Sequence, residues 1–98
     1  MSITVHIYYS GQGENAKNFA REMAESGTLD AVRAEDGCES YEYFYPVDNP
    51  ETVLLIVRWA DQAAIDFHHK TPMMQEIARL REKYKLHMRV SRYTDLSK

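Results

Sequence analysis

Two adjacent histidines near the end of a helical pattern are the residues of this chain best suited to acid–base chemistry. In WADQAAIDFHHKTPMM, residues 59–74, Ala64, Ile65 and His68 recur at the spacing of one helix face. Because an imidazole titrates close to neutral pH, it serves as a general acid or base with little tuning. His68 is predicted to face inward, either as an acid–base or hydrogen-bonding group in a pocket or as a hydrogen-bonded core residue. Spacing alone favours the core role. His69 lies about 100° further round the helix, nearer its edge.

Aromatic and arginine side chains are candidates for the walls of such a pocket. Flat rings suit a planar aromatic ligand, although core and interface packing accounts for most of them. Three arginines lie on or near predicted strands, and one of them could stabilise an anionic substrate, although solvated positions also suit each: Arg58, Arg89 and Arg92. The residues selected as candidate substrate contacts are Trp59, His6, Tyr8, Tyr43 and Arg89.

The remaining ligand-type residues do not form a recognisable metal site. Adjacent histidines on a helix point in different directions and do not chelate one ion. His6 and His87 could meet on neighbouring strands, but no carboxylate or cysteine pattern accompanies them. The single cysteine, Cys38, excludes an internal disulfide and is interpreted as a small hydrophobic residue. We therefore predict no metal ligands.

Length and charge limit the class of protein. The 98 residues suit one domain, residues 1–98, with a modest core. A net charge of -3 and the lack of a basic run argue against nucleic acid as a partner. No apolar run approaches the roughly 18 residues of a membrane span, and the first residues lack a signal-peptide pattern. A cytoplasmic protein without a membrane span is expected.

The hydrophobic pattern predicts four strands and four helical segments. Alternating or continuous apolar residues with β-branched and aromatic side chains predict strands over 2–10, 38–47, 52–59 and 86–93. Helical spacing predicts helices over 14–26, 29–35, 60–70 and 71–85. Thr28 and Thr71 are the expected N-caps of the second and fourth helices, and Pro72 suits a first helical position.

This order predicts an α+β fold of the ferredoxin-like type, with a split βαββαβ arrangement. In that fold an antiparallel four-stranded sheet carries its helices on one face. The strand over 52–59 is nevertheless apolar on both faces, and such strands are usually covered on both sides. Because the chain has no further element to cover the second face, a homodimer through the open sheet face is expected.

Two segments resemble the antibiotic biosynthesis monooxygenase domain family, in particular its quinol monooxygenase-like members. AEDGCESYEYF, residues 34–44, is similar to the family's acidic residue, Gly-Cys and aromatic strand. LLIVRWADQAAIDFHHKTPMM, residues 54–74, is similar to its strand ending in tryptophan, followed by helix, histidine and Ser/Thr-Pro. The resemblance implies a dimeric α+β barrel. It also implies that His68 is the base or hydrogen-bonding group and that Trp59 lines the pocket.

The resemblance further implies oxidation of a quinol or related phenolic, polyketide-like aromatic by O₂ without flavin, haem or metal. A deprotonated dihydroxyaromatic reduces O₂ directly, so the protein supplies a base, donors and a water-poor cavity. Met73 stands where some relatives carry another histidine, and Ala78 stands where the haem-degrading branch carries its haem ligand. Two alternatives stay open: a non-catalytic small-molecule binding module, and an isomerase of a small oxygenated metabolite.

Overall fold

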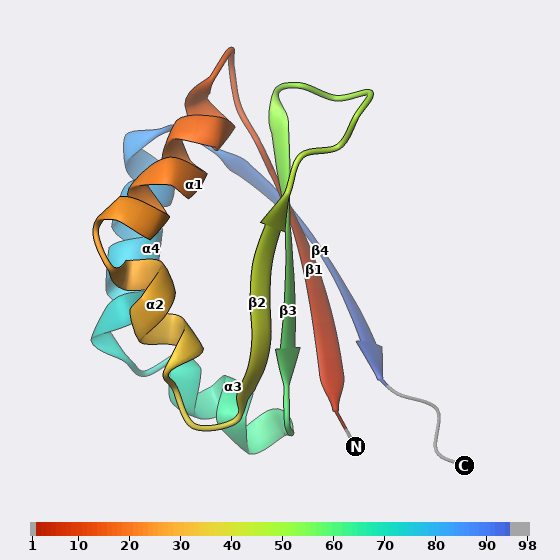
Figure 1. Ribbon diagram of the computed structural model, residues 1–98, viewed down its shortest axis with the longest axis vertical. Helices are drawn as coiled ribbons and strands as arrows, with labels where there is room; N and C mark the ends of the chain where they lie inside the picture. The colour runs from red at the N-terminus through yellow and green to blue at the C-terminus, as the bar shows by residue number, and fades with distance from the viewer. Residues whose placement is uncertain (1, 95–98) are drawn as a thin grey trace.

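In the computed structural model, residues 2–94 are described, and they form a four-stranded antiparallel sheet with helices packed against one face (Figure 1). The strands are β1 (Ile3–Ser10), β2 (Cys38–Phe44), β3 (Thr52–Trp59) and β4 (His87–Thr94). The helices are α1 (Asn15–Glu25), α2 (Thr28–Arg33), α3 (Gln62–His68) and α4 (Pro72–Lys83). The strand order β2-β3-β1-β4, with every neighbouring pair antiparallel, confirms the predicted ferredoxin-like βαββαβ fold.

The apolar face of α1 anchors the helical layer to the sheet. Ala16, Phe19, Ala20 and Met23 are all buried, and their spacing places them on one face of the helix. The ring of Phe19 lies with its centroid 4.7 Å from that of Tyr9 on β1. This contact holds α1 over the sheet, because tilted aromatic pairs at this separation add to the stabilisation from buried area.

One of the two predicted N-cap positions differs in the structure. Gly27, with φ +84°, occupies the N-cap of α2, and Thr28 is the first helical residue. Thr71 does occupy the N-cap of α4, with Pro72 first in the helix as predicted, but its side chain does not cap that helix. Its hydroxyl instead donates to the carbonyl oxygen of His68 at 2.8 Å. The hydroxyl is used there because the last carbonyls of α3 lack partners inside that helix.

Strand β2 ends earlier than the sequence pattern predicted. Tyr41 is buried on the helix-covered face and Tyr43 is half-buried beside it, but Tyr45 lies beyond the strand and is 59% exposed. Pro46 explains the difference, because proline cannot donate to the sheet and restricts the residue before it. The tyrosines on the helix-covered face of β2 are therefore Tyr41 and Tyr43.

The helical layer covers β2 and β3 and stops over β1. On β3, Leu55 and Val57 are only 2% and 3% exposed. Their register partners on β1, Ile7 and Val5, face the same side but are only half-buried. Further out on β4, Val90 pairs with Ile7 and is 53% exposed. An apolar margin of the sheet therefore continues past the edge of the helices.

The opposite face of the sheet is open and carries both apolar and aromatic side chains. Leu54 and Ile56 of β3 lie half-buried on this face. The guanidinium of Arg89 lies 4.4 Å from the ring centroid of Tyr8, which is its register partner. Among residues 2–94, no helix lies against this face of the sheet (Figure 1).

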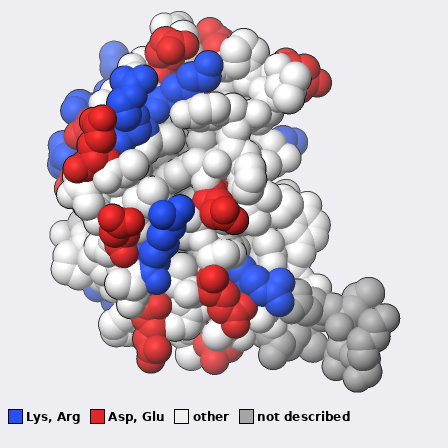
Figure 2. All heavy atoms as spheres, in the orientation of Figure 1, with Lys and Arg blue, Asp and Glu red and all other residues white. Residues whose placement is uncertain are grey.

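Charged residues of both signs are interspersed over the face of the molecule shown in Figure 2. Lys and Arg are thus not segregated from Asp and Glu there. Within residues 2–94, no helix is both long enough and apolar enough to cross a bilayer.

Candidate active site

His68 lies at the C-terminal end of α3, with its side chain directed toward the sheet. The helix begins after Asp61, whose carboxylate accepts a hydrogen bond of 2.9 Å from the backbone N–H of Ala64. Ala64, Ile65 and His68 are the buried residues of α3, and His68 is 7% exposed. The inward orientation predicted from helical spacing is confirmed.

The imidazole of His68 is hydrogen-bonded to a buried glutamate. Its Nδ1 lies 2.9 Å and 3.0 Å from the two carboxylate oxygens of Glu35, which is 8% exposed. An ionised carboxylate only accepts hydrogen bonds, so Nδ1 donates the proton. The neutral ring then carries its lone pair on Nε2. The pair has the arrangement in which a carboxylate orients a histidine that acts as a base.

The turn that carries Glu35 packs directly on α3. Gly37, two residues later, has φ +87°, and a Cβ there would lie 2.5 Å from the Cβ of Ala64. The carbonyl of Gly37 also accepts a hydrogen bond of 2.8 Å from the backbone N–H of Ala60. A glycine and two alanines thus let the turn and the helix approach closely enough for Glu35 and His68 to meet.

Trp59 covers the other side of the histidine. Its ring centroid lies 4.8 Å from that of His68, with 37° between the planes. Among residues 2–94, neither His68 Nε2 nor Trp59 Nε1 has a hydrogen-bond partner. Every fully buried side-chain nitrogen or oxygen in that range does have a partner, so these two nitrogens are not fully buried. Both nitrogens are therefore accessible, one as a proton acceptor and the other as a donor.

A small apolar cavity lies beside these two rings, between the sheet and helices α3 and α4. Its volume is about 80 Å³, whereas an apolar cavity that binds benzene has a volume of about 150 Å³. An aromatic ligand would therefore have to displace part of the wall, and an unbranched methionine such as Met74 adapts most easily. The lining residues are Val5, Ile7, Tyr9, Tyr41, Leu55, Val57, Trp59, Ile65, His68, His69, Met74 and Ile77.

The tyrosines near the cavity are neutral at physiological pH. Burial raises the pKa of Tyr41 to about 12, and its hydrogen bond with the Tyr43 hydroxyl only partly offsets this. Burial also raises the pKa of Tyr9 and of Tyr43 well above the usual range for a phenol. These hydroxyls can donate hydrogen bonds but do not act as bases. The His68–Glu35 pair is therefore the acid–base group suited to this cavity.

The structure brings together only part of the predicted site. His68 and Trp59 line the cavity. Tyr43 shares their face of the sheet but packs edge-on against Phe19, with ring centroids 6.3 Å apart, and does not line it. The other three candidates, His6, Tyr8 and Arg89, lie on the open face, because they occupy the alternate positions of β1 and β4. Any ligand contact they make is on that face.

Sequence reasoning did not select Glu35, although a signal for it was present. Glu35 and Asp36 both precede Gly-Cys in residues 34–44, where the family resemblance includes an acidic residue. Glu35 and His68 are 33 positions apart in the sequence, so no local pattern indicated that they form a pair. Tyr9, Tyr41 and Met74 were likewise missed as cavity residues.

Other ligand-type residues do not assemble a second polar centre. Across residues 2–94, no group of three or more His, Cys, Asp or Glu side chains is arranged to hold a metal ion. His6 pairs with Ser91, whereas His87 pairs with Ser10 at the other end of β1. Burial raises the pKa of the half-buried Cys38 thiol, and the charge of Glu35 acts in the same direction, which disfavours the reactive thiolate.

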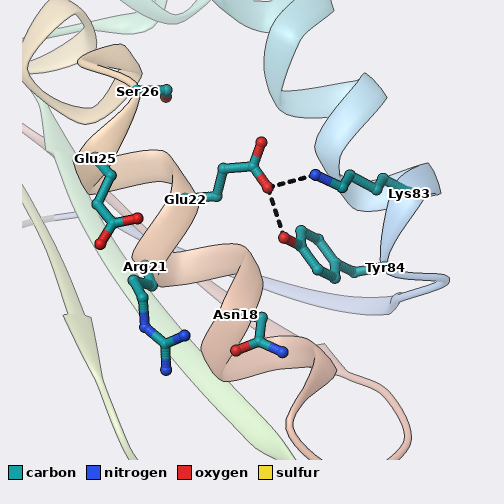
Figure 3. A pocket seen from close by; sticks show the side chains of 7 residues that line it. All are labelled: Asn18, Arg21, Glu22, Glu25, Ser26, Lys83 and Tyr84. Carbon is teal, nitrogen blue, oxygen red and sulfur yellow. Dashed lines mark hydrogen bonds and ion pairs between the residues drawn. The ribbon is translucent and has the colours of Figure 1, made fainter.

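A larger groove of about 590 Å³ lies between α1 and the end of α4 (Figure 3). Glu22 extends across it and accepts hydrogen bonds from Lys83 Nζ at 2.7 Å and from the hydroxyl of Tyr84. These hydrogen bonds lower the pKa of Glu22, so it stays ionised and bridges the two helices. The groove holds a satisfied surface ion network, whereas the smaller cavity holds accessible ring nitrogens.

Comparison with known proteins assigns the family. Residues 2–80 match the family described as "Antibiotic biosynthesis monooxygenase". The chain belongs to the antibiotic biosynthesis monooxygenase family. A curated relative in Bacillus subtilis (strain 168), "Putative monooxygenase YcnE", is 31% identical over 73 residues, covering 74% of this chain and 75% of the relative. The predicted family is thus confirmed.

Solved structures share the antibiotic biosynthesis monooxygenase fold of this chain. Rv0793 from Mycobacterium tuberculosis superimposes with a TM-score of 0.81 at 20% identity, covering 100% of this chain and 98% of that protein. SnoaB, a cofactor-independent oxygenase from Streptomyces nogalater, superimposes with a TM-score of 0.80 at 15% identity, covering 99% and 95%. At these identities the comparison establishes the fold alone.

Proposed function

We propose that this protein is a cofactor-independent monooxygenase that oxidises a quinol or a related phenolic aromatic with O₂. The observation that carries the proposal is the buried His68–Glu35 pair beside an apolar cavity. Membership in a family of monooxygenases supports the reaction class. The fold shared with SnoaB, which is described as a cofactor-independent oxygenase, supports chemistry in which the substrate supplies the electrons.

The proposed reaction begins with proton transfer from a phenolic hydroxyl to His68 Nε2. The Glu35 carboxylate, hydrogen-bonded to Nδ1, stabilises the imidazolium that forms. The phenolate then transfers one electron to O₂, and the resulting radical and superoxide combine through a new C–O bond. His68 returns its proton to the peroxide, and loss of water leaves a carbonyl. The overall change, SH₂ + O₂ → SO + H₂O, balances without an external reductant.

The cavity walls contribute to the same reaction. The indole N–H of Trp59 is a donor suited to the developing anion, and buried donors act more strongly in a water-poor site. The apolar walls exclude water from the radical pair, which would otherwise be lost to side reactions. In this proposal the base, the donor and the dry cavity are the whole catalytic machinery.

Oxygen consumption tests the proposal. Chelator-treated, flavin-free protein is mixed with a panel of hydroquinones and naphthol-type phenols, and uptake is followed with an electrode. We expect at least one substrate to be consumed, and His68→Ala to lower the rate by about tenfold or more, equivalent to about 1.4 kcal/mol of barrier. The matched control is His87→Ala, which removes an exposed histidine on the open face and leaves the rate unchanged.

Two outcomes would contradict the oxygenase assignment. Substrate conversion at an equal rate under argon would identify an isomerase. Ligand-induced thermal stabilisation with no product on any substrate would identify a binding module.

We further propose that the protein is a cytoplasmic homodimer joined through the open sheet face. Leu54 and Ile56 on that face are half-buried, and Phe44 beside them is 44% exposed. An apolar sheet face of this kind is stabilised when it packs on a second copy of itself. Such a dimer would leave the cavity on the helical side of each chain accessible.

A further inference from the structure

The helical layer leaves an uncovered margin of the sheet directly beside the cavity. Val5 and Ile7 of β1 line the cavity, and their register partners on β4 are Arg92 and Val90. Directly opposite residues share one face of a sheet, so Val90 and Arg92 extend the cavity floor outward. Met88, the next residue on this face, is 44% exposed. We call the strip formed by Met88, Val90 and Arg92 the cavity mouth.

Two arginines connect this mouth to the helices. Arg92 donates a hydrogen bond to Oε1 of Gln62 at the start of α3. Arg81 of α4 contacts the sulfur of Met88 through Nη1 at 3.2 Å. Met88 and Arg92 are four residues apart on one strand, a span of about 13 Å. The strip is therefore long enough for a bicyclic aromatic molecule to lie on it.

The charge of Arg92 is not neutralised by a carboxylate within residues 2–94. Its acceptor is the neutral amide of Gln62, and the Nε2 of that amide donates to Asp66 at 3.0 Å. A guanidinium binds a carboxylate more strongly than an amide, because the bonds are charge-assisted and bidentate. Arg92 can therefore replace its hydrogen bond to Gln62 with one to an anionic ligand group, with little loss of free energy.

We propose that the cavity mouth selects an aromatic carboxylic acid. Its carboxylate binds Arg92, its rings lie on Val90 and Ile7, and its phenolic hydroxyl reaches His68. The oxidation of that hydroxyl rests on the proposed function, but the selective binding of the acid does not. The neutral end of such a molecule enters the small cavity as Met74 moves aside.

Binding is measured through Trp59, the single tryptophan of the chain, which lines the cavity. Its fluorescence is titrated under argon with 1-hydroxy-2-naphthoate and, separately, with 1-naphthol. We expect the acid to bind about tenfold more tightly, the factor that one charge-assisted hydrogen bond contributes. Arg92→Gln should remove this preference without weakening the binding of 1-naphthol.

A second variant removes the free charge but keeps the arginine. Gln62→Glu supplies a carboxylate partner to Arg92 and should also abolish the preference. The matched control is Arg21→Gln, an exposed arginine on α1 away from the cavity, which should retain it. Equal affinity of the wild-type protein for both probes would overturn the proposal, as would the absence of any fluorescence change. Loss of the preference in Arg89→Gln instead of Arg92→Gln would place the ligand on the open face and also overturn it.

These outcomes are independent of oxygen consumption. If the acid is preferred but no phenol consumes O₂, the recognition of the ligand stands and the oxygenase assignment fails. If phenols are oxidised but the acid is not preferred, the oxygenase assignment stands and the role of Arg92 fails.

Discussion

The pairing of His68 with Glu35 is the residue-level feature that gives the cavity its chemistry. Burial of a carboxylate costs free energy unless the group is paired, and Glu35 has its partner, His68, within 3.0 Å. The bond fixes the tautomer of the histidine and stabilises its protonated form. We therefore assign Glu35 the role of a positioning residue, because it acts on the substrate only through His68.

Glu35→Gln tests this role. The amide still accepts a hydrogen bond from Nδ1, but it no longer carries the charge that stabilises the imidazolium. We expect kcat to fall about ten- to a hundredfold, the range of one hydrogen bond to a charged group, while KM stays within about twofold. Steady-state O₂ uptake with a substrate found in the panel gives both constants. An unchanged kcat would show that the charge of Glu35 does not act on His68 during the reaction, and would contradict the positioning role.

At the scale of elements, the short helix α3 positions the catalytic group, and its two ends are secured differently. Asp61 caps the first turn, and the hydroxyl of Thr71 binds the last carbonyl, that of His68 itself. A helix of 7 residues is marginal alone, so these polar contacts and its packing hold it in place.

Asp61→Ala should destabilise the protein by about 1 kcal/mol, because the first turn of α3 loses its side-chain cap. Urea unfolding followed by circular dichroism measures the effect as a lower midpoint with an unchanged slope. The matched control is Asp66→Ala, an exposed acid on the same helix, for which we expect a change within about 0.5 kcal/mol. Equal effects of the two substitutions would mean that the cap is not what secures α3.

At the scale of the whole molecule, the two faces of the sheet have different proposed roles. The helix-covered face supplies the cavity, with its mouth at β4, and the open face is the one we propose to form the dimer. The sheet thus separates recognition of a ligand from assembly of the protein. Stable homodimers bury about 1,600 Å² or more in total.

Ile56→Asp should convert the proposed dimer into a folded monomer. The side chain lies on the open face, where a charge is tolerated in the single chain but not in an apolar interface. Light scattering coupled to gel filtration measures the mass. Val47→Asp, at a fully exposed loop position, is the control and should remain dimeric. A wild-type protein with the mass of one chain would refute the dimer.

The sequence by itself determined the elements and the orientation of single side chains. The period of each pattern is local, so it identified the strands, the buried face of α1 and the inward direction of His68. The resemblance carried by residues 54–74 pointed to the right family.

Only the tertiary structure decided which of these side chains meet. Glu35 reaches His68 because a turn at Gly37 packs against Ala64, and no local period encodes a contact between segments 33 positions apart. The edge of the helical layer over β1, and hence the mouth beside Arg92, depends on how far the helices extend across the sheet. That extent is set by the packing of all layers together, because each element is held by contacts that the others supply.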